Sequence, residues 1–209
     1  MPLIKIAVFA SGGGSNLQAL IDAQEAGLIK GKIGLVFSNV PTAGALERAE
    51  NHRIESVSIA SKGYPGTRDE YDQEVLTLCQ AKKIDLVCLA GYMRIVTPVL
   101  VRPYLNKMMN IHPALLPKFG GEGMYGHFVH EAVLKAKESE SGATVHFVTE
   151  GVDAGPIILQ GSVKVLANDT PGTLADRILK IEHRIYPEAV QLFCQGKITV
   201  SDGRVKISH

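Results

Sequence analysis

The chain has 209 residues, a length that suits one compact domain with a core of its own. Hydrophobic residues make up 45% of the sequence and charged residues 21%, which argues against a disordered chain. The formal net charge of +1 gives no general reason to expect nucleic acid, a membrane surface or another polyanion as a partner. Any phosphate must therefore be bound by a local site.

The apolar residues indicate neither a membrane segment nor a secretory leader. No apolar run approaches the ~18 residues that a membrane helix needs. Lys5 interrupts the first apolar run, which we interpret as a strand. Cys79, Cys88 and Cys194 form no C-x-x-C pair and lie among apolar residues, so we expect reduced core cysteines in a cytoplasmic protein.

Apolar, β-branched runs alternate with helical patterns from the N-terminus to His112. This rhythm predicts a doubly wound, mostly parallel, Rossmann-like α/β sheet. The expected strands are 3–10, 32–38, 55–60, 84–91 and 107–112, and the expected helices are 15–27, 43–52, 67–83 and a short piece at 98–105 that Pro103 interrupts.

The pattern changes after residue 115, where we predict an antiparallel extension within a single domain of residues 1–209. A glycine-rich loop at 116–128 and a short helix at 130–137 precede two adjoining strands, 143–150 and 155–166. A long helix at 170–196 has Thr170 as its expected N-cap. The last segment, 198–207, contains an Asp-Gly pair that is typical of a hairpin.

The sequence ASGGGSN, residues 10–16, lies between the first expected strand and the first helix. Glycines let the backbone approach a ligand, and a helix N-terminus favours an anion, so the pattern predicts a phosphate site. The dinucleotide fingerprint is incomplete because Leu17 replaces its third glycine and no acidic residue ends the second strand. A tight turn with a helix cap at Ser15 is the structural alternative.

Asn110 and His112 lie two residues apart at the end of the fifth expected strand, in NIHPALLPKF. Residues at this spacing point to the same side of a strand. A carboxamide and an imidazole placed together can donate hydrogen bonds to a developing oxyanion. A polar strand end explains the same spacing equally well. Asp153 lies in a loop between two strands, and nothing local ties it to His112 rather than to an ordinary turn.

The other histidines carry weaker signals. His127 and His130 form H-x-x-H before Glu131, but the spacing does not match the zinc-binding helix motif, so we do not predict a metal. We expect His146 to be packed or exposed rather than catalytic, and Glu182 with its neighbouring histidine on the last helix fits an ordinary solvated face.

Five motifs in order resemble the phosphoribosylglycinamide formyltransferases, folate-dependent formyltransferases of purine biosynthesis. They are SGGGSN, LAGYMRI, NIHPALLPKF, TVHFVTEGVDAGP and EHRIYP, and they extend over nearly the whole chain. The resemblance implies transfer of a formyl group from the cosubstrate 10-formyltetrahydrofolate to the amine of glycinamide ribonucleotide. It implies two small-molecule partners, with no nucleic acid or membrane, and either a monomer or a homodimer.

The family's site residues fall on specific positions of this chain. The catalytic positions are Asn110, His112 and Asp153; the substrate-binding positions are Gly14, Ser15, Asn16, Arg68 and Glu182; the folate-binding positions are Met93, Arg94, Ile95, Val96, Thr149, Glu150, Gly151 and Val152. We expect direct transfer through a tetrahedral oxyanion, without a metal or a covalent intermediate. In this mechanism Asp153 keeps His112 protonated and leaves its other ring nitrogen free to donate.

The segment FGGEGMYGHFVHE is longer and richer in glycine than is common in the family, so no role is carried over to His127 or His130. Residues 120–128 are expected either to close over the folate or to form a simple surface connection. Methionyl-tRNA formyltransferase and formyltetrahydrofolate hydrolase resemble the chain around NIHPALLP, but each usually carries an added domain for which this chain has no room. A non-catalytic binding module is disfavoured because all three catalytic positions are filled.

Overall fold

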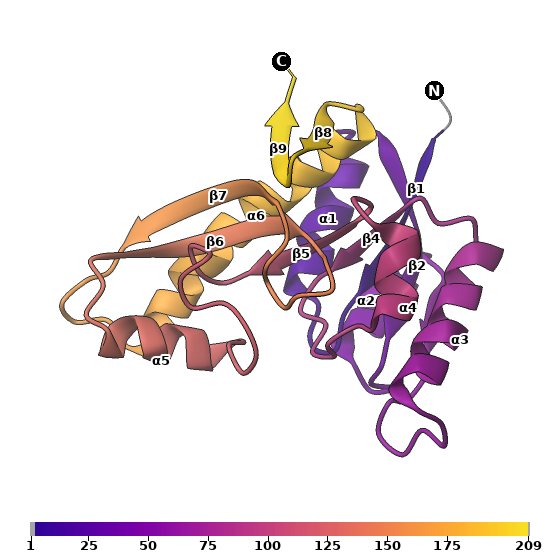
Figure 1. Cartoon of the computed structure of the whole chain (residues 1–209), viewed down its shortest axis with the longest axis horizontal. Coiled ribbons are helices and arrows are strands. Elements are labelled where there is room, and N and C mark those ends of the chain that lie inside the picture. Colours follow the sequence, from indigo (N-terminus) through magenta and orange to yellow (C-terminus); the bar gives the residue numbers. More distant parts are fainter. Residues whose placement is uncertain (1–2, 209) are drawn as a thin grey trace. The chain divides into compact units, whose positions relative to one another are not determined.

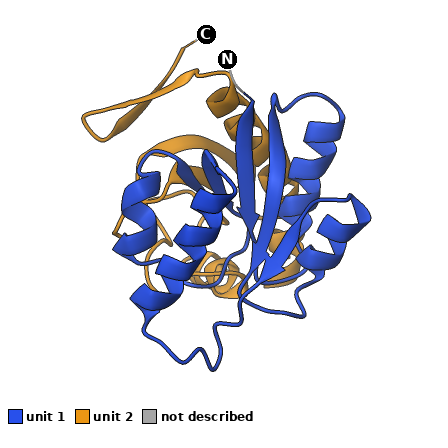
Figure 2. Cartoon of the chain, turned by 90° about the vertical axis from the view of Figure 1, so that its right-hand side faces the viewer, with its two compact units in different colours: residues 1–109 blue, residues 110–209 orange. Residues whose placement is uncertain are grey.

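The computed structural model describes residues 3–208 and divides the chain into two compact units, residues 1–109 and residues 110–209 (Figure 2). The strands, labelled in Figure 1, are β1 (Ile4–Phe9), β2 (Gly31–Ser38), β3 (Ser56–Ser58), β4 (Leu86–Leu89), β5 (Met108–His112), β6 (Glu140–Phe147), β7 (Ile157–Lys164), β8 (Ile198–Ser201) and β9 (Arg204–Ile207). The helices are α1 (Ser15–Glu25), α2 (Gly44–Asn51), α3 (Arg68–Ala81), α4 (Pro98–Val101), α5 (His127–Lys135) and α6 (Pro171–Cys194), with a 3₁₀ turn, η1 (Arg102–Tyr104).

The strands form a seven-stranded sheet in the order β3-β2-β1-β4-β5-β6-β7 and a separate hairpin, β8-β9. In the first unit β1 pairs in parallel with both β2 and β4, and β2 pairs in parallel with β3. Figure 2 shows helices on both sides of these strands. The doubly wound, mostly parallel α/β sheet predicted from the alternating pattern is therefore confirmed.

The core of the first unit is built from the apolar residues of its central strands. Residues 6–9 of β1 are fully buried, as expected for a parallel strand with helices on both faces. Phe9 packs against Phe37 of β2 with ring centroids 4.9 Å apart and against Tyr92 at 5.4 Å. These contacts hold the ends of β1, β2 and β4 together, next to the loops that follow them.

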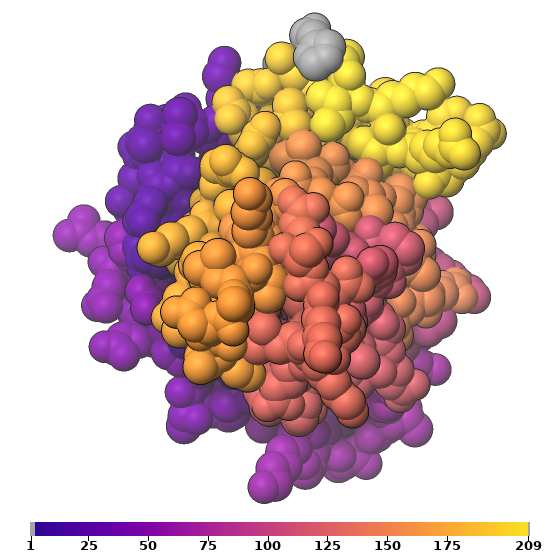
Figure 3. All heavy atoms as spheres, turned by 90° about the vertical axis from the view of Figure 1, so that its left-hand side faces the viewer, coloured from indigo at the N-terminus to yellow at the C-terminus, as the bar shows by residue number. Residues whose placement is uncertain are grey.

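The second unit contains an antiparallel strand pair on which α6 packs, with α5 packed against α6. β6 and β7 pair antiparallel over most of their length, which confirms the predicted extension. The long helix α6 begins after Thr170, whose side chain accepts from the Thr173 N–H as predicted for an N-cap. Figure 3 shows a face of this unit, coloured salmon to yellow along the sequence.

Some boundaries differ from those predicted. The glycine-rich loop ends at residue 126, because α5 begins at His127 rather than at residue 130. β6 begins at Glu140 rather than at residue 143, since its first residues continue the ladder opposite Lys164. The three cysteines are buried, as expected. One domain over residues 1–209 stays a prediction.

Within residues 3–208, no helix combines the length and the apolar character needed to cross a membrane.

Candidate active site

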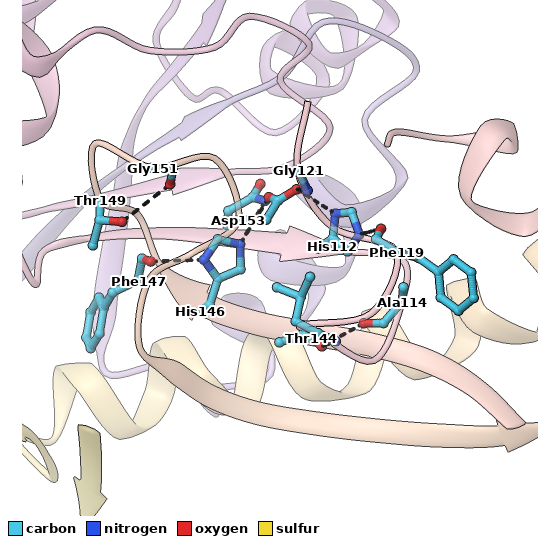
Figure 4. Close-up of polar contacts among 12 residues, drawn as sticks. His112, Ala114, Phe119, Gly121, Thr144, His146, Phe147, Thr149, Gly151 and Asp153 are labelled. Carbon is cyan, nitrogen blue, oxygen red and sulfur yellow. Dashed lines mark hydrogen bonds and ion pairs between the residues drawn. The ribbon is translucent and has the colours of Figure 1, made fainter. Parts of the chain in front are cut away.

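The candidate active site in residues 110–209 is centred on the end of β5. Asn110 and His112 come from this strand. His146 comes from β6, and Figure 4 shows its ring near that of His112. His112 and His146 are almost fully buried, and Asn110 is half-buried. The predicted polar strand end therefore faces into protein, where its side chains need polar partners.

Asp153 lies between the two imidazole rings. Its Oδ2 atom is 3.5 Å from Nδ1 of His112, and its Oδ1 atom is 3.5 Å from Nε2 of His146. The backbone N–H of Gly121 donates to Oδ2 at 3.0 Å. Asp153 adopts a φ of 52°, a left-handed conformation that aspartate tolerates better than most residues. The structure thus brings together His112 and Asp153, which no local sequence feature connected.

The second ring nitrogen of His112 has a partner in the glycine-rich segment. Nε2 lies 2.8 Å from the carbonyl oxygen of Phe119, and because a carbonyl only accepts, Nε2 carries a proton and donates. We expected this nitrogen to be free to donate to a substrate. It is engaged because the backbone at Phe119, with a φ of 56°, turns back towards the site. Figure 4 shows Phe119 and Gly121 meeting His112 and Asp153 from this segment.

The charges of the site follow from its burial. Burial lowers the pKa of His112 below its ordinary value, although the charge of Asp153 and the bond to Phe119 raise it. Burial alone raises the pKa of Asp153, but its contacts with His146, His112 and Gly121 outweigh burial and hold that pKa below its usual value. Asp153 acts on the pKa of His112 in the predicted direction, although burial acts on that pKa more strongly. The expectation that Asp153 keeps His112 protonated stays a prediction.

His146 is the contact that sequence reasoning missed. Its Nε2 atom lies 3.2 Å from Nδ2 of Asn110, and its Nδ1 atom donates to the Phe147 carbonyl at 2.9 Å. The ring therefore fixes the plane of the Asn110 carboxamide while it contacts Asp153. The sequence could have indicated His146 through the alternation of a strand. Thr144 and His146 lie two positions apart, so they share one face of an otherwise apolar part of β6.

Thr144 holds the segment that leaves β5. Its hydroxyl donates to the Ala114 carbonyl at 2.6 Å and accepts from the Leu116 N–H at 3.1 Å and from Gln160 at 2.9 Å. A hydroxyl has one donor and two acceptor positions, so this fully buried group uses all of them. The Leu116–Pro117 peptide bond that follows is cis. The backbone after His112 is thus tied to β6.

In the first unit, the loop ASGGGSN, residues 10–16, is hydrogen-bonded to α2. The Gly12 carbonyl accepts from the Ala45 N–H at 3.1 Å, and the Gly13 carbonyl accepts from Nε of Arg48 at 2.7 Å. These bonds turn two carbonyl oxygens towards α2, which suits a loop that must offer N–H groups to an anion. Arg48 carried no signal in the sequence, because it resembles any charged residue on a helix.

One part of the structural alternative for this loop, the helix cap at Ser15, is wrong. Ser15 is the first residue of α1, and the N-cap is Gly14, which has no side chain and a φ of 74°. A Cβ atom at Gly14 would lie 2.9 Å from both Cα and Cβ of Ala45. Glycine is needed here because α2 packs so closely and the backbone is left-handed.

The residues predicted to bind folate in the first unit, 93–96, form a segment with Thr97 that we call the strap, residues 93–97. Met93 and Ile95 are exposed, whereas the guanidinium of Arg94 turns inward, 3.2 Å from Asp72 and 4.1 Å above the Tyr71 ring. Arg94 can therefore serve a ligand through its backbone rather than its charge. Val96 is buried.

Two further contacts hold the strap. The Thr97 N–H donates to Asp72 at 2.5 Å, and Arg68, predicted to contact the ribonucleotide, donates to the Ile95 carbonyl at 2.7 Å. Arg68 is thus attached to the strap itself.

The remaining predicted residues lie in the second unit. Thr149 follows β6 and donates to the Gly151 carbonyl at 3.4 Å, while Glu150, Gly151 and Val152 are exposed. Glu182 is a buried residue of α6 rather than part of the solvated face that the charge pattern suggested.

His130 is buried on α5, and burial together with the charge of His112 lowers its pKa. His127 stacks on Phe128 with centroids 4.0 Å apart. Over the described range 3–208, no group of three or more His, Cys, Asp or Glu side chains is arranged to hold a metal ion.

Fold and site together describe an α/β protein with polar groups at the carboxyl ends of parallel strands, where this class binds ligands. A model of the formyl transferase family matches residues 4–190, and the chain belongs to this family. Phosphoribosylglycinamide formyltransferase of Escherichia coli (strain K12) is 39% identical over 199 residues, which cover 95% of this chain and 91% of that protein.

Two further relatives show the range of the family. The trifunctional purine biosynthetic protein adenosine-3 of Drosophila melanogaster is 43% identical over 94% of this chain, but the chain spans only 14% of that protein's length. The crystal structure of glycinamide ribonucleotide transformylase 1 from Symbiobacterium toebii is 42% identical, with a TM-score of 0.94 over 99% of this chain and 95% of that one. This likeness confirms the predicted fold over nearly the whole chain.

Proposed function

We propose that this chain transfers the formyl group of 10-formyltetrahydrofolate to the amine of glycinamide ribonucleotide, a step of de novo purine biosynthesis. The products are formylglycinamide ribonucleotide and tetrahydrofolate. The observation that carries the proposal is the cluster of half-buried Asn110 and Asp153 around buried His112 in a member of the formyl transferase family. The similarity to the Escherichia coli enzyme over 91% of its length supports the choice of substrates.

In the proposed reaction the amine nitrogen attacks the formyl carbon, and the formyl oxygen becomes an oxyanion. Asn110 and Nε2 of His112 donate hydrogen bonds to this oxygen as its charge develops. The tetrahedral intermediate then collapses, the bond from carbon to the folate nitrogen breaks, and that nitrogen takes the proton that the amine loses. Asp153 and His146 orient the two donors throughout, at the 3.5 Å and 3.2 Å separations given above.

The Phe119 carbonyl marks where the substrate oxygen binds in this proposal. It accepts from the same nitrogen of His112 that must donate to the oxyanion. For transfer, the formyl oxygen replaces the Phe119 oxygen as acceptor. The exchange needs only a local displacement of a segment that contains Gly120 and Gly121, residues with wide backbone freedom.

We assign the other predicted residues to binding. Gly14, Ser15 and Asn16 hold the phosphate at the start of α1, where the N–H groups and the helix dipole favour an anion. Arg68 and Glu182 contact the ribonucleotide. Residues 93–96 and 149–152 contact the folate. The reaction needs no metal in this scheme because hydrogen-bond donors meet the oxyanion. The buried cysteines suit a reducing compartment such as the cytoplasm.

The test is turnover by the purified chain with both substrates. We expect tetrahydrofolate and formylglycinamide ribonucleotide in equal amounts, with loss of activity in His112→Ala. An assay without glycinamide ribonucleotide is the control for hydrolysis of the folate. Formation of tetrahydrofolate and formate at the same rate in that control would replace the transferase proposal with a hydrolase.

A further inference from the structure

A chain of hydrogen bonds crosses the carboxyl ends of four neighbouring strands in the first unit. The Met93 N–H donates to Oγ of Ser11 at 2.8 Å, and Ser11 donates its own proton to Oδ1 of Asn39 at 2.6 Å. Nδ2 of Asn39 then donates to Ser61 at 3.1 Å. These residues follow β4, β1, β2 and β3, which are adjacent in the sheet.

The direction of each bond is determined by the groups that make it. A backbone N–H can only donate, so Oγ of Ser11 must accept from Met93 and is left with its single proton for Asn39. Asn39 is only 8% exposed, and its own backbone carbonyl accepts from the Ser61 N–H at 3.1 Å. Asn39 thus has a fixed orientation, and it fixes the orientation of the Ser11 hydroxyl.

Ser11 connects two segments with different proposed ligands. It belongs to the loop ASGGGSN, residues 10–16, which contains the proposed phosphate-binding residues at the start of α1. Its hydroxyl also holds the N–H of Met93, the first residue of the strap, and its backbone N–H donates to the Gly91 carbonyl at 3.0 Å. The other end of the strap is held separately, by the Thr97 N–H on Asp72.

We propose that Ser11 is a positioning residue for the folate cosubstrate, acting through its hydroxyl as oriented by Asn39. By holding the Met93 N–H, it sets the path of the strap and leaves Met93 52% exposed and available to the ligand. The inference rests on the proposed function, because it takes residues 93–96 as the folate-binding segment. It adds a role for two residues that neither contact nor transform the substrates in the proposed mechanism.

The test compares Ser11→Ala, Ser11→Thr and Asn39→Ala with the unaltered chain. Dissociation constants for 5,8-dideazafolate and for glycinamide ribonucleotide are measured separately by calorimetry, and exchange of the Met93 amide is followed by NMR. Ser58→Ala is the matched control, because Ser58 is an exposed serine of β3 in the same unit. Thermal unfolding of every variant shows whether the fold is kept.

We expect Ser11→Ala and Asn39→Ala each to weaken 5,8-dideazafolate binding roughly ten-fold, since each leaves a polar group without its partner. Binding of glycinamide ribonucleotide should change by less than about two-fold in both variants, because the bonds to Gly12 and Gly13 from α2 remain. The Met93 amide should exchange faster. Ser11→Thr keeps the hydroxyl and should restore both properties, and the double alanine variant should be no weaker than either single one.

Equal weakening of both ligands, or unchanged binding of 5,8-dideazafolate by Ser11→Ala, would overturn the proposal. Additive losses in the double variant would show that Asn39 does not act through Ser11. If the unaltered chain itself fails to bind 5,8-dideazafolate, the proposed function fails instead, so the two failures are distinguishable.

Discussion

His112 donates a hydrogen bond from Nε2 to the backbone oxygen of Phe119 at 2.8 Å, while its Nδ1 atom faces Asp153 at 3.5 Å. Both ring nitrogens therefore have partners without a substrate. The Phe119 oxygen satisfies a buried donor that would otherwise be costly to leave unpaired. In the proposed mechanism a substrate oxygen replaces this acceptor, so the His112 donor is already oriented before the substrate binds.

Asn110→Ala should lower kcat strongly and change substrate binding little. The carboxamide is held against His146 at 3.2 Å and is proposed to meet the oxyanion only in the transition state. Loss of one oxyanion donor costs about 10²–10³ in rate. Steady-state kinetics with both substrates provide the measurement. A variant with full kcat and a raised KM for the folate would make Asn110 a ligand contact instead.

Asp153→Asn should lower the pKa of His112 further below its ordinary value. Burial already favours the neutral imidazole, and the charge of Asp153 is the main influence that opposes burial. A neutral asparagine removes that opposition, so the imidazolium form is lost at a lower pH in the variant. NMR titration of His112 in both proteins gives the comparison. An unchanged or raised pKa in a folded variant would contradict the electrostatic role.

Arg48→Gln should weaken binding of glycinamide ribonucleotide and leave folate binding nearly unchanged. The substitution removes the bond from Nε to the Gly13 carbonyl and frees that oxygen to turn towards the phosphate. We expect a loss of roughly ten-fold, the effect of one bond made by a charged group. Calorimetry with each ligand separates the two effects.

Arg53→Gln serves as the matched control, because Arg53 is exposed and lies just beyond α2. Gly14→Val is a poor probe of the same loop, since its side chain would collide with Ala45. Equal loss of affinity in the Arg48 and Arg53 variants would indicate a general effect of charge.

Residues 122–126 should exchange their amide hydrogens rapidly in the free protein and slowly with a folate analogue bound. These residues belong to the glycine-rich segment that reaches the site through Phe119 and Gly121, so closure would exclude water from the reaction. The Gly121 amide should be slower than its neighbours even without ligand, because it donates to Asp153. Hydrogen exchange with and without 5,8-dideazafolate checks both statements, and equal protection in the two states would make the segment a simple connection.

The same segment is crowded at Gly120, where other side chains lie close to the backbone. An added Cβ would lie 2.5 Å from a Leu116 methyl group and 3.3 Å from Cβ of Asp153. Any larger residue here must push the Leu116 side chain aside and would press against Asp153. This crowding explains a glycine that the sequence alone showed only as a mark of flexibility.

Several features were determined by the sequence alone because their physics is local. Alternating apolar runs predicted the parallel strands and their order along the chain, and Thr170 was identified as the cap of α6 from its neighbours. An Asp-Gly pair favours positive φ at both residues of a two-residue turn. Asp202 and Gly203 adopt it between β8 and β9, so the pair itself indicated this hairpin. The shared side of Asn110 and His112 follows from the two-residue period of a strand.

Only the tertiary structure decided which distant groups meet. Asp153 and His146 reach His112 and Asn110 because β6 and the loop after it pack beside the end of β5, and no local preference encodes that neighbourhood. Ser11 and Met93 are 82 positions apart, yet they meet because β1 and β4 are adjacent parallel strands that end at the same edge. The lowered pKa of His112 also depends on the fold, since the desolvation that lowers it exists only in the folded chain.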